Sequence, residues 1–251
     1  MDNNWFPYEI DNKKYKLICF NHAGGNSTIF KDWINWDEEV DVIPVEIPGR
    51  RRRIREECRT DFKGLVEDVS REIDRLRVKG ILDREGGIYI YGHSLGGALG
   101  FEVGKVLMDK YHFLVKALFI AGRHAPQDED PTPYRTVMGI DKLKEELRRS
   151  GNTPEELLEN DSFMSIFLPM IFADYQLHED YKYDGRAIDC EIYTLSGSND
   201  TEADINHMKN WETATCKPLI QKEFIGGHFF AYEESSTEVK DFILNVIKGE
   251  K

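Results

Sequence analysis

Residues 87–103 have the sequence GIYIYGHSLGGALGFEV, and this stretch decides the fold. Its first part, Gly87–Tyr91, has alternating isoleucine and tyrosine after the glycine and predicts a short buried strand. Its last part begins at Leu95, is rich in small residues and predicts a helix that packs closely on that strand. The residues between them, Gly92-His93-Ser94-Leu95-Gly96, form a G-x-S-x-G motif at a strand-to-helix turn.

This motif predicts a nucleophilic serine. Small residues on both sides of Ser94 allow a strained turn, a nucleophile elbow, that lifts the hydroxyl into the open. The N–H of Leu95 lies at the helix start, where the amide and the helix dipole stabilise a developing oxyanion. A chance glycine-rich turn is the alternative, and the strand-to-helix context argues against it. We therefore predict Ser94 as the nucleophile and Leu95 as one oxyanion donor.

Strand and helix patterns alternate on both sides of the motif. In Asp61–Val78, for example, the apolar residues recur with helical spacing and predict one buried helix face. Alternation of this kind is typical of an α/β fold, in which a mostly parallel sheet is flanked by helices. The further strands are expected at Tyr15–Phe20, Val40–Ile47, Val115–Ala121, Ile188–Leu195 and Leu219–Ile225, and the further helices near 29–36, 203–213 and 237–248.

The alternation stops between Arg123 and Tyr183, where only helical patterns remain. We expect a single domain over residues 1–251 with a helical lid inserted at approximately 123–183. The segment IFLPMIFA, residues 166–173, is apolar on every side and must therefore be buried against something. It is interpreted either as plain packing of the lid or as a surface that contacts an acyl chain.

A serine on such an elbow needs a base and an orienting acid, in the chain order serine, acid, histidine. His228 follows the last strand pattern through Gly226-Gly227, so its ring can swing over the strand ends. Asp200 lies in the loop directly after a strand, whereas Asp204 is expected to begin the next helix. The other histidines fit the order or the position less well. We predict His228 as the base and Asp200 as the acid.

The loop after the first strand is expected to supply a second oxyanion donor. His22-Ala23-Gly24-Gly25 is similar to the HGGG-type loop of serine hydrolases, and the N–H of Ala23 is the candidate donor. His22 has two interpretations, a second base or a residue that fixes the loop by a hydrogen bond. We favour the second.

Composition excludes several classes of function. The 251 residues include 33 Lys and Arg against 46 Asp and Glu, a net charge of −13 that argues against nucleic-acid and anionic-membrane binding. The longest apolar stretches are shorter than the ~18–20 residues of a membrane span, and the first residues do not resemble a signal peptide. The four cysteines lack metal-ligand or redox spacing. We expect a cytoplasmic monomer with reduced thiols and no metal or cofactor.

An ordered set of segments resembles one family, the type II, external editing thioesterases of nonribosomal peptide and polyketide synthesis. The resemblance extends from about Tyr15 to Ile247. Its segments are FNHAGGNSTIFKDW, VEIPGRRRRIRE, YIYGHSLGGALGFEV, LPMIFADYQLHEDY, a G-x-x-D acid and GGHFF. One departure is Asn21, where the family usually has proline, and it concerns the shape of the oxyanion loop.

The resemblance implies an α/β-hydrolase fold with a helical lid. It also implies hydrolysis of aberrant acyl groups from the phosphopantetheine arm of carrier proteins, without metal or bound cofactor. The matching residues are Ser94 as nucleophile, His228 as base, Asp200 as acid, and Ala23 and Leu95 as oxyanion donors. A general acyl-CoA or small-ester hydrolase with the same triad is the alternative. A non-catalytic docking module has no need of the complete set.

Arg50, Arg51, Arg52 and Arg53, followed by Arg55, form the one dense group of positive charge in this acidic sequence. A solvated loop is one interpretation. The other is a contact with an acidic carrier protein or with the phosphate of its pantetheine arm.

Overall fold

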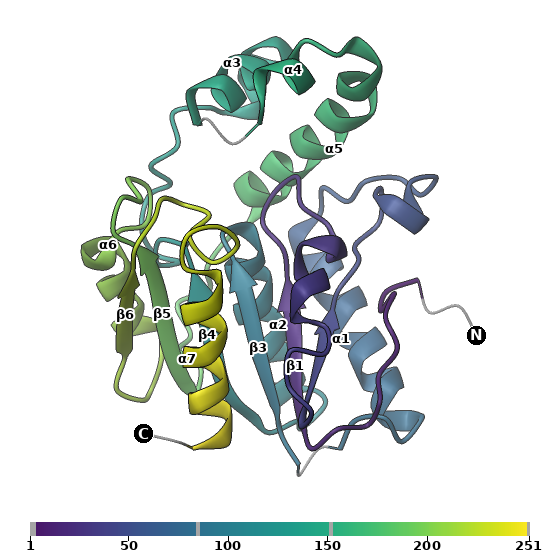
Figure 1. Ribbon diagram of the computed structural model, residues 1–251, viewed down its shortest axis with the longest axis vertical. Coiled ribbons are helices and arrows are strands. Elements are labelled where there is room, and N and C mark those ends of the chain that lie inside the picture. The colour runs from purple at the N-terminus through teal and green to yellow at the C-terminus, as the bar shows by residue number, and fades with distance from the viewer. Residues whose placement is uncertain (1–3, 84–85, 151–152, 250–251) are drawn as a thin grey trace.

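The computed structural model describes residues 4–83, 86–150 and 153–249. These residues contain one parallel sheet of six strands in the order β2-β1-β3-β4-β5-β6 (Figure 1). The α/β architecture is thus the one predicted. The strands are β1 Tyr15–Phe20, β2 Val40–Pro44, β3 Ile88–His93, β4 Val115–Ala121, β5 Glu191–Gly197 and β6 Ile220–Phe224.

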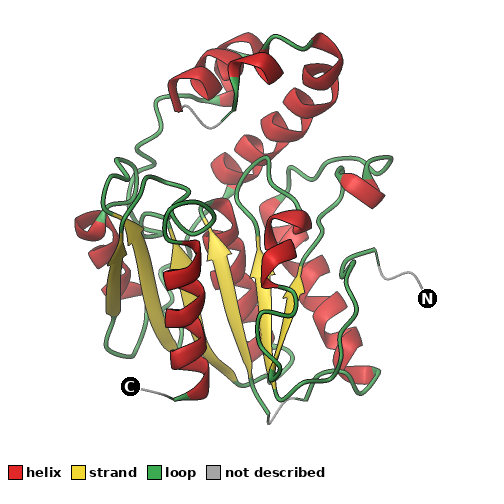
Figure 2. Cartoon of the chain, viewed as in Figure 1, coloured by secondary structure: helices red, strands yellow, loops and turns green. Residues whose placement is uncertain are grey.

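Helices cover both faces of the sheet (Figure 2). Alternating strand residues such as Ile18 and Ile90 pack toward α1 (Phe62–Val78) and α2 (Leu95–Asp109). Their neighbours, such as Leu17, pack toward α7 (Ser236–Lys248) and the 3₁₀ helix η1 (Ser27–Trp33). The side-chain period of two therefore gives every central strand two buried faces. The remaining short helices of the body are η2 Arg51–Arg53, α6 Ile205–Lys209 and η4 Asn210–Ala214.

The strand order creates a crevice at the carboxyl edge of the sheet. From β1 the chain passes to the edge strand β2 and then returns to β3 on the other side of β1. Loops that leave β1 and β3 therefore diverge, and ligands of open α/β sheets bind at such a switch point. The loop 21–25 follows β1, and Ser94 follows β3.

The predicted insertion is helical and lies over this edge (Figure 1). It contains η3 Thr136–Met138, α3 Ile140–Ser150, α4 Glu155–Leu158 and α5 Asp161–Asp180. We call residues 123–183 the lid. A small core of its own is formed by Tyr134, Leu143, Leu147, Leu158, Met164 and Ile171.

The long helix α5 joins the lid to the body. Leu177 is fully buried in the main core, and Asp180 accepts a 2.8 Å hydrogen bond from the N–H of Phe62. Pro169 lies within α5 and removes one N–H from its hydrogen-bond ladder. The C-terminal half of α5 is therefore part of the body, and the N-terminal half packs with the lid.

Several boundaries differ from the expected ones. The strand expected at Val40–Ile47 ends at Pro44, although the N–H of Val45 still bonds to Cys19. Ile188 forms only an isolated bridge with Thr215. The helix expected over 203–213 is split into α6 and η4. Within the described residues, no helix is long and apolar enough to cross a membrane, and all four cysteines are free.

Candidate active site

Ser94 occupies a strained turn between β3 and α2. Its φ of 53° and ψ of −118° lie outside the regions that non-glycine residues favour. A Cβ at Gly92 would lie 2.1 Å from the carbonyl oxygen of Gly96, and one at Gly96 would lie 2.4 Å from that of Phe20. Only glycine fits both positions, so the motif is required by sterics. The turn leaves Ser94 half-buried at the crevice.

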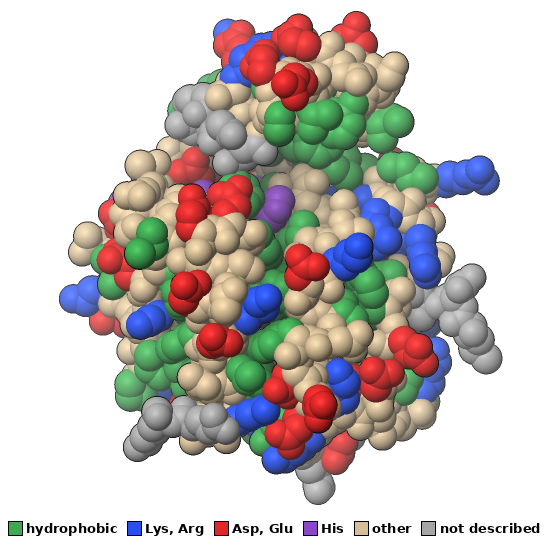
Figure 3. Space-filling model, viewed as in Figure 1, with side chains coloured by type: hydrophobic (Ala, Val, Ile, Leu, Met, Phe, Trp, Pro, Cys, Tyr) green, Lys and Arg blue, Asp and Glu red, His purple; other side chains and the backbone are tan. Residues whose placement is uncertain are grey.

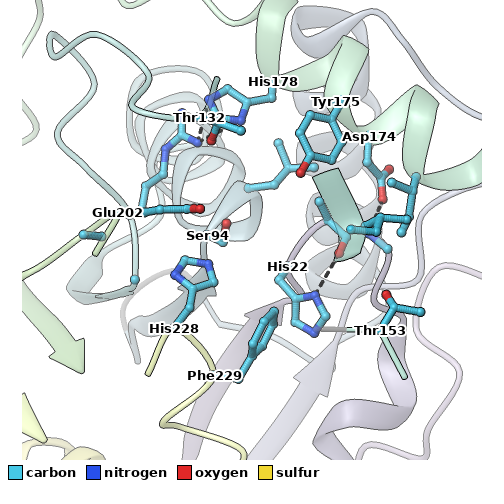
Figure 4. A pocket seen from close by; sticks show the side chains of 18 of the residues that line it. His22, Ser94, Thr132, Thr153, Asp174, Tyr175, His178, Glu202, His228 and Phe229 are labelled. Carbon is cyan, nitrogen blue, oxygen red and sulfur yellow. Dashed lines mark hydrogen bonds between the residues drawn. The ribbon is translucent and has the colours of Figure 1, made fainter. Parts of the chain in front are cut away.

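Asp200 and His228 meet beside this serine. Nδ1 of His228 lies 2.8 Å from Oδ2 of Asp200, and the other carboxylate oxygen accepts from the N–H groups of Glu202 and Ala203. Because a carboxylate only accepts, Nδ1 carries the proton and Nε2 is left to act as a base. Figure 4 shows the His228 ring and Ser94 facing one another.

The environment of the pair favours an ionised Asp200 and a protonated His228. Burial alone would raise the pKa of Asp200, but the bond to His228 and the backbone donors outweigh it and lower that pKa. Burial alone would lower the pKa of His228, but Asp200 outweighs it and raises that pKa. Asp200 therefore stays ionised and stabilises a proton on His228. An arrangement of this kind can take a proton from a serine hydroxyl and return it.

The loop 22–25, which we call the oxyanion loop, is held by hydrogen bonds that its carbonyl groups accept. The carbonyl of His22 accepts hydrogen bonds from Gly25 N (3.0 Å) and from the side-chain amide of Asn21 (2.8 Å). In a trans peptide the N–H points away from the carbonyl, so the N–H of Ala23 is directed out of the loop. Asn21, where proline is usual, thus takes part in orienting the predicted donor.

Leu95 is the first residue of α2, and its N–H has no helical partner. Both Leu95 and Ala23 line the pocket that contains Ser94 and His228. The structure therefore brings together all five residues predicted for the nucleophile, base, acid and oxyanion donors.

The neighbouring histidines are neutral. Nδ1 of His22 donates to the carbonyl of Ala23 at 2.8 Å, and burial lowers the pKa of His22 to about 4. Burial, and then the neighbouring His228, hold the pKa of His93 well below its usual range. Its ring lies 5.1 Å from that of His228 and closes the back of the site. His22 thus makes the loop-fixing bond that the sequence favoured.

The lid and the body enclose a pocket of about 430 Å³ above Ser94. Figure 3 shows the hollow, with hydrophobic side chains on the underside of the lid and a histidine at its floor. From α5, Phe167, Ile171 and Tyr175 line it, and Phe229 and Glu202 line it from the body. The apolar segment 166–173 therefore packs within the lid and also lines the pocket, although Ile166 is largely exposed.

The arginine run is not a surface patch, and the expectation is wrong for two of its residues. Arg50 is 2% exposed and forms an ion pair with Asp174. Arg53 is buried and bonds to Glu56 and to the carbonyl of Glu46. Two members remain at the surface. Arg51 is tethered by a 2.6 Å bond to Ser27, and Arg52 is exposed.

The sequence-based prediction missed Asp174. This residue is fully buried on α5, lines the pocket and bonds to the oxyanion loop. The signal was present, because an ionisable residue that follows the apolar segment 166–173 is unusual unless it has a partner. Its partner Arg50 is distant in the sequence, and only the fold brings the two together.

Within residues 4–83, 86–150 and 153–249, one group has the donor atoms to hold a metal ion. Ligand atoms of His124, Asp130 and His178 lie within 4.8 Å of one another at the pocket edge. However, Nη1 of Arg123 lies 3.0 Å from Nε2 of His178, and Arg135 pairs with Asp130 at 3.1 Å. Two guanidinium groups at this distance oppose a divalent cation. The absence of a metal from the reaction stays a prediction.

Comparison with known proteins identifies the family and the fold. The family described as "Thioesterase domain" matches residues 15–246. The chain belongs to the thioesterase family. This thioesterase is 30% identical over 254 residues to the gramicidin S biosynthesis protein GrsT of Aneurinibacillus migulanus, covering 98% of this chain and 94% of the relative. It is 29% identical to thioesterase PikA5 of Streptomyces venezuelae, covering 93% and 82%.

Solved structures agree with this assignment. The prodiginine-pathway thioesterase RedJ of Streptomyces coelicolor is 25% identical with a TM-score of 0.81, covering 97% of this chain and 98% of that one. The type II thioesterase BorB from the borrelidin cluster is 27% identical with a TM-score of 0.78, covering 92% and 91%. The resemblance to type II thioesterases of nonribosomal peptide and polyketide synthesis is thus confirmed, as is the α/β-hydrolase fold.

Proposed function

We propose that this thioesterase removes aberrant or stalled acyl groups from the phosphopantetheine arm of carrier proteins, through an acyl-Ser94 intermediate. The observation that carries the proposal is the Asp200–His228 hydrogen bond of 2.8 Å beside the strained Ser94, at the floor of a pocket that the lid covers. An activated serine under a hydrophobic roof suits a thioester with an acyl chain.

Ser94 and His228 account for each proton transfer of the reaction. The hydroxyl of Ser94 attacks the thioester carbonyl while Nε2 of His228 takes its proton. The resulting oxyanion lies between the N–H groups of Ala23 and Leu95. Collapse breaks the C–S bond, and His228 returns the proton to the departing pantetheine thiol. Water then attacks the acyl-Ser94 ester with the same base, and the free acid leaves.

The carrier partner belongs to the proposal and has support from two sources. Among the similar solved structures, ClbQ comes from the colibactin nonribosomal peptide and polyketide synthase pathway, and BorB is a type II thioesterase from the borrelidin cluster. On this chain, Arg52 is exposed and follows Arg50, which contacts the oxyanion loop, by two residues. An exposed positive charge at this point of the chain suits an acidic carrier or the pantetheine phosphate. A cytoplasmic location also stays a prediction.

The test compares one acyl group on three leaving groups. We expect kcat/KM to be higher for the acyl carrier protein than for the acyl-coenzyme A, and higher for both than for the p-nitrophenyl ester. Contacts with the carrier and its arm position the carbonyl, whereas a small ester offers little remote binding energy. Equal values on carrier protein and coenzyme A contradict the carrier role and favour a general acyl hydrolase.

Charge reversal tests the arginine contact. Arg52→Glu is expected to lower kcat/KM for the acyl carrier protein severalfold at low salt, less at high salt, and to spare the p-nitrophenyl ester. Arg51 is less suitable because it bonds to buried Glu46. Lys110→Glu makes the same charge change on an exposed residue just after α2, at the opposite edge of the sheet, and is expected to have no effect.

A further inference from the structure

Asp174 connects the lid helix α5 directly to the oxyanion loop. Its Oδ2 accepts a 2.7 Å hydrogen bond from the N–H of Gly24. The same carboxylate receives both terminal nitrogens of Arg50, Nη2 at 2.6 Å and Nη1 at 3.2 Å. The side chains are 1% and 2% exposed. The carboxylate therefore has a backbone donor of the loop and a buried guanidinium as its partners. Figure 4 shows Asp174 at the side of the pocket.

Arg50 also bonds directly to the same loop. Its Nη1 donates to the carbonyl of Gly25 at 2.8 Å. Together the two side chains bind the N–H of Gly24 and the carbonyl of Gly25. They complete the anchoring of the loop, because His22 already holds the carbonyl of Ala23. The peptide that joins Ala23 to Gly24 is thus fixed at both its carbonyl and its N–H.

This loop needs anchors because its own sequence is flexible. Gly24 has a φ of 74°, and the Gly24-Gly25 pair can adopt many other conformations. A Cβ at Gly24 would lie 2.7 Å from Cδ1 of Ile171, so α5 sits directly on the loop. An oxyanion donor is effective only when it is oriented before charge develops. A loose Ala23 N–H would have to be ordered again in every catalytic cycle.

We propose that Asp174 and Arg50 form a clasp that positions the oxyanion loop, so that a helix of the lid contributes to the alignment of the oxyanion hole. Both are positioning residues, because they act through Gly24, Gly25 and Ala23. The inference rests on the proposed function, since it assigns Ala23 as an oxyanion donor. A purely structural pair is the competing explanation, and a buried ion pair can often be replaced by apolar residues without loss of stability.

That replacement is the test. The double variant Arg50→Met/Asp174→Leu removes both charges together and both anchors of the loop. We expect thermal stability close to that of the wild type and a kcat lower by roughly 10- to 100-fold, with KM within about threefold. The loss is expected to be smaller than the ~10²–10³ of an abolished oxyanion donor. The same loss of kcat is expected with the acyl carrier protein and with a p-nitrophenyl ester, because both react at the same oxyanion hole.

The chain offers a matched control. Lys16 and Asp41 form another buried ion pair, and Asp41 likewise accepts a backbone N–H, from Lys13 at 2.8 Å. This pair lies at the amino ends of β1 and β2, far from Ser94. Lys16→Met/Asp41→Leu is therefore expected to leave kcat unchanged, whatever its effect on stability.

A second variant and a direct readout keep the proposal falsifiable if the double variant does not fold. Asp174→Asn retains an acceptor for the N–H of Gly24 but loses the charge that pairs with Arg50. It is expected to retain more kcat than Asp174→Ala, and hydrogen exchange at the Gly24 amide is expected to be slow in the wild type, intermediate in Asp174→Asn and fast in Asp174→Ala.

Two results would overturn the clasp. One is a kcat within twofold of the wild type in the folded double variant or in Asp174→Ala, with unchanged exchange at Gly24. The other is a loss confined to KM for the acyl carrier protein, which would assign the pair to lid binding. Failure of the proposed acyl-Ser94 mechanism is distinguishable, because Ser94→Ala would then remain active whatever happens at Asp174. Failure of the carrier role alone would appear as equal kcat/KM on carrier protein and coenzyme A.

Discussion

Asp200 uses its two carboxylate oxygens for different partners, with Oδ2 2.8 Å from Nδ1 of His228 and Oδ1 bonded to backbone N–H groups. The backbone bonds fix the rotation of the carboxylate, and the carboxylate in turn fixes the ring. His228 therefore presents Nε2 to Ser94 in one tautomer. In the proposed mechanism, the loop after β5 and the turn after β6 therefore determine the proton transfer at the end of β3.

Asp200→Asn removes this control of the tautomer. An amide can donate to Nδ1 and would leave the proton on Nε2, so kcat is expected to fall by roughly 10³- to 10⁴-fold with the fold intact. His228→Ala is expected to lose somewhat more. The double variant is expected to be no slower than His228→Ala alone, because the residues act as a unit. Steady-state kinetics of the three variants measure this, and multiplicative losses would contradict it.

The pH profile follows from the raised pKa of His228. Only the neutral ring is a base, so kcat/KM is expected to rise with pH through an apparent pKa above the usual ~6.5. Asp200→Asn is expected to move the residual activity to a lower apparent pKa, because the main cause of the increase is gone. The measurement is kcat/KM between pH 5 and 9. A flat profile in the wild type would indicate another base or a rate-limiting motion of the lid.

Stability is expected to fall on mild acidification. Burial lowers the pKa of His22 to about 4 and that of His124 to about 3, whereas both titrate near ~6.5 in the unfolded chain. As pH falls through ~6.5, the unfolded state binds these protons first, and stability is lost progressively down to the folded values. His228 has a raised pKa and acts in the opposite sense, so it offsets part of the loss.

The free energy of unfolding at pH 7 and pH 5, measured by urea titration, checks this expectation. His124→Asn is expected to reduce the difference between the two values. The control is His112→Asn, since His112 is exposed and lies in a left-handed turn that Asn also adopts. If His124→Asn leaves the difference between pH 7 and pH 5 unchanged, burial of that ring is not the cause.

Motion of the lid is expected to begin at Pro169. The C-terminal half of α5 is held by Asp174, Leu177 and Asp180, and the N-terminal half contacts mainly the small lid core. Amides of 163–168 are therefore expected to exchange faster than those of 175–180 in the free protein, and to slow when an acyl phosphonate occupies Ser94. Protection across 162–175 equal to that of the central strands, with or without ligand, would mean a rigid cover.

Much of the fold could be predicted because its signals are local. The bounds of β1 and β4 match the expected strands, since each is an apolar run with a single lysine at its second position. The elbow could be predicted because Gly92 and Gly96 are dictated by sterics within a few residues of Ser94. Strand ends were less certain, because pairing with a neighbour decides where a ladder stops, as at Pro44.

The site residues that escaped prediction depend on long-range contacts. Arg50 resembles a surface arginine in the sequence, and only its contact with Asp174 makes it a buried anchor. A run of neighbouring arginines in the sequence shows how many positive charges there are, but not which of them are buried. Asn21 is a different case, because its side-chain amide bonds to the carbonyl of the very next residue, and residue identity alone does not reveal such a bond. Local sequence patterns thus identified the candidate catalytic residues, whereas the contacts that orient them depend on the tertiary fold.

Acyl groups are expected to pass through Ser94. The most direct measurement is the intact mass of the enzyme, quenched within milliseconds of mixing with an acyl carrier protein. We expect a transient mass increase of one acyl group that peptide mapping places on Ser94, and neither adduct nor turnover in a folded Ser94→Ala variant. An acyl group on another residue, or undiminished hydrolysis by Ser94→Ala, would contradict the account.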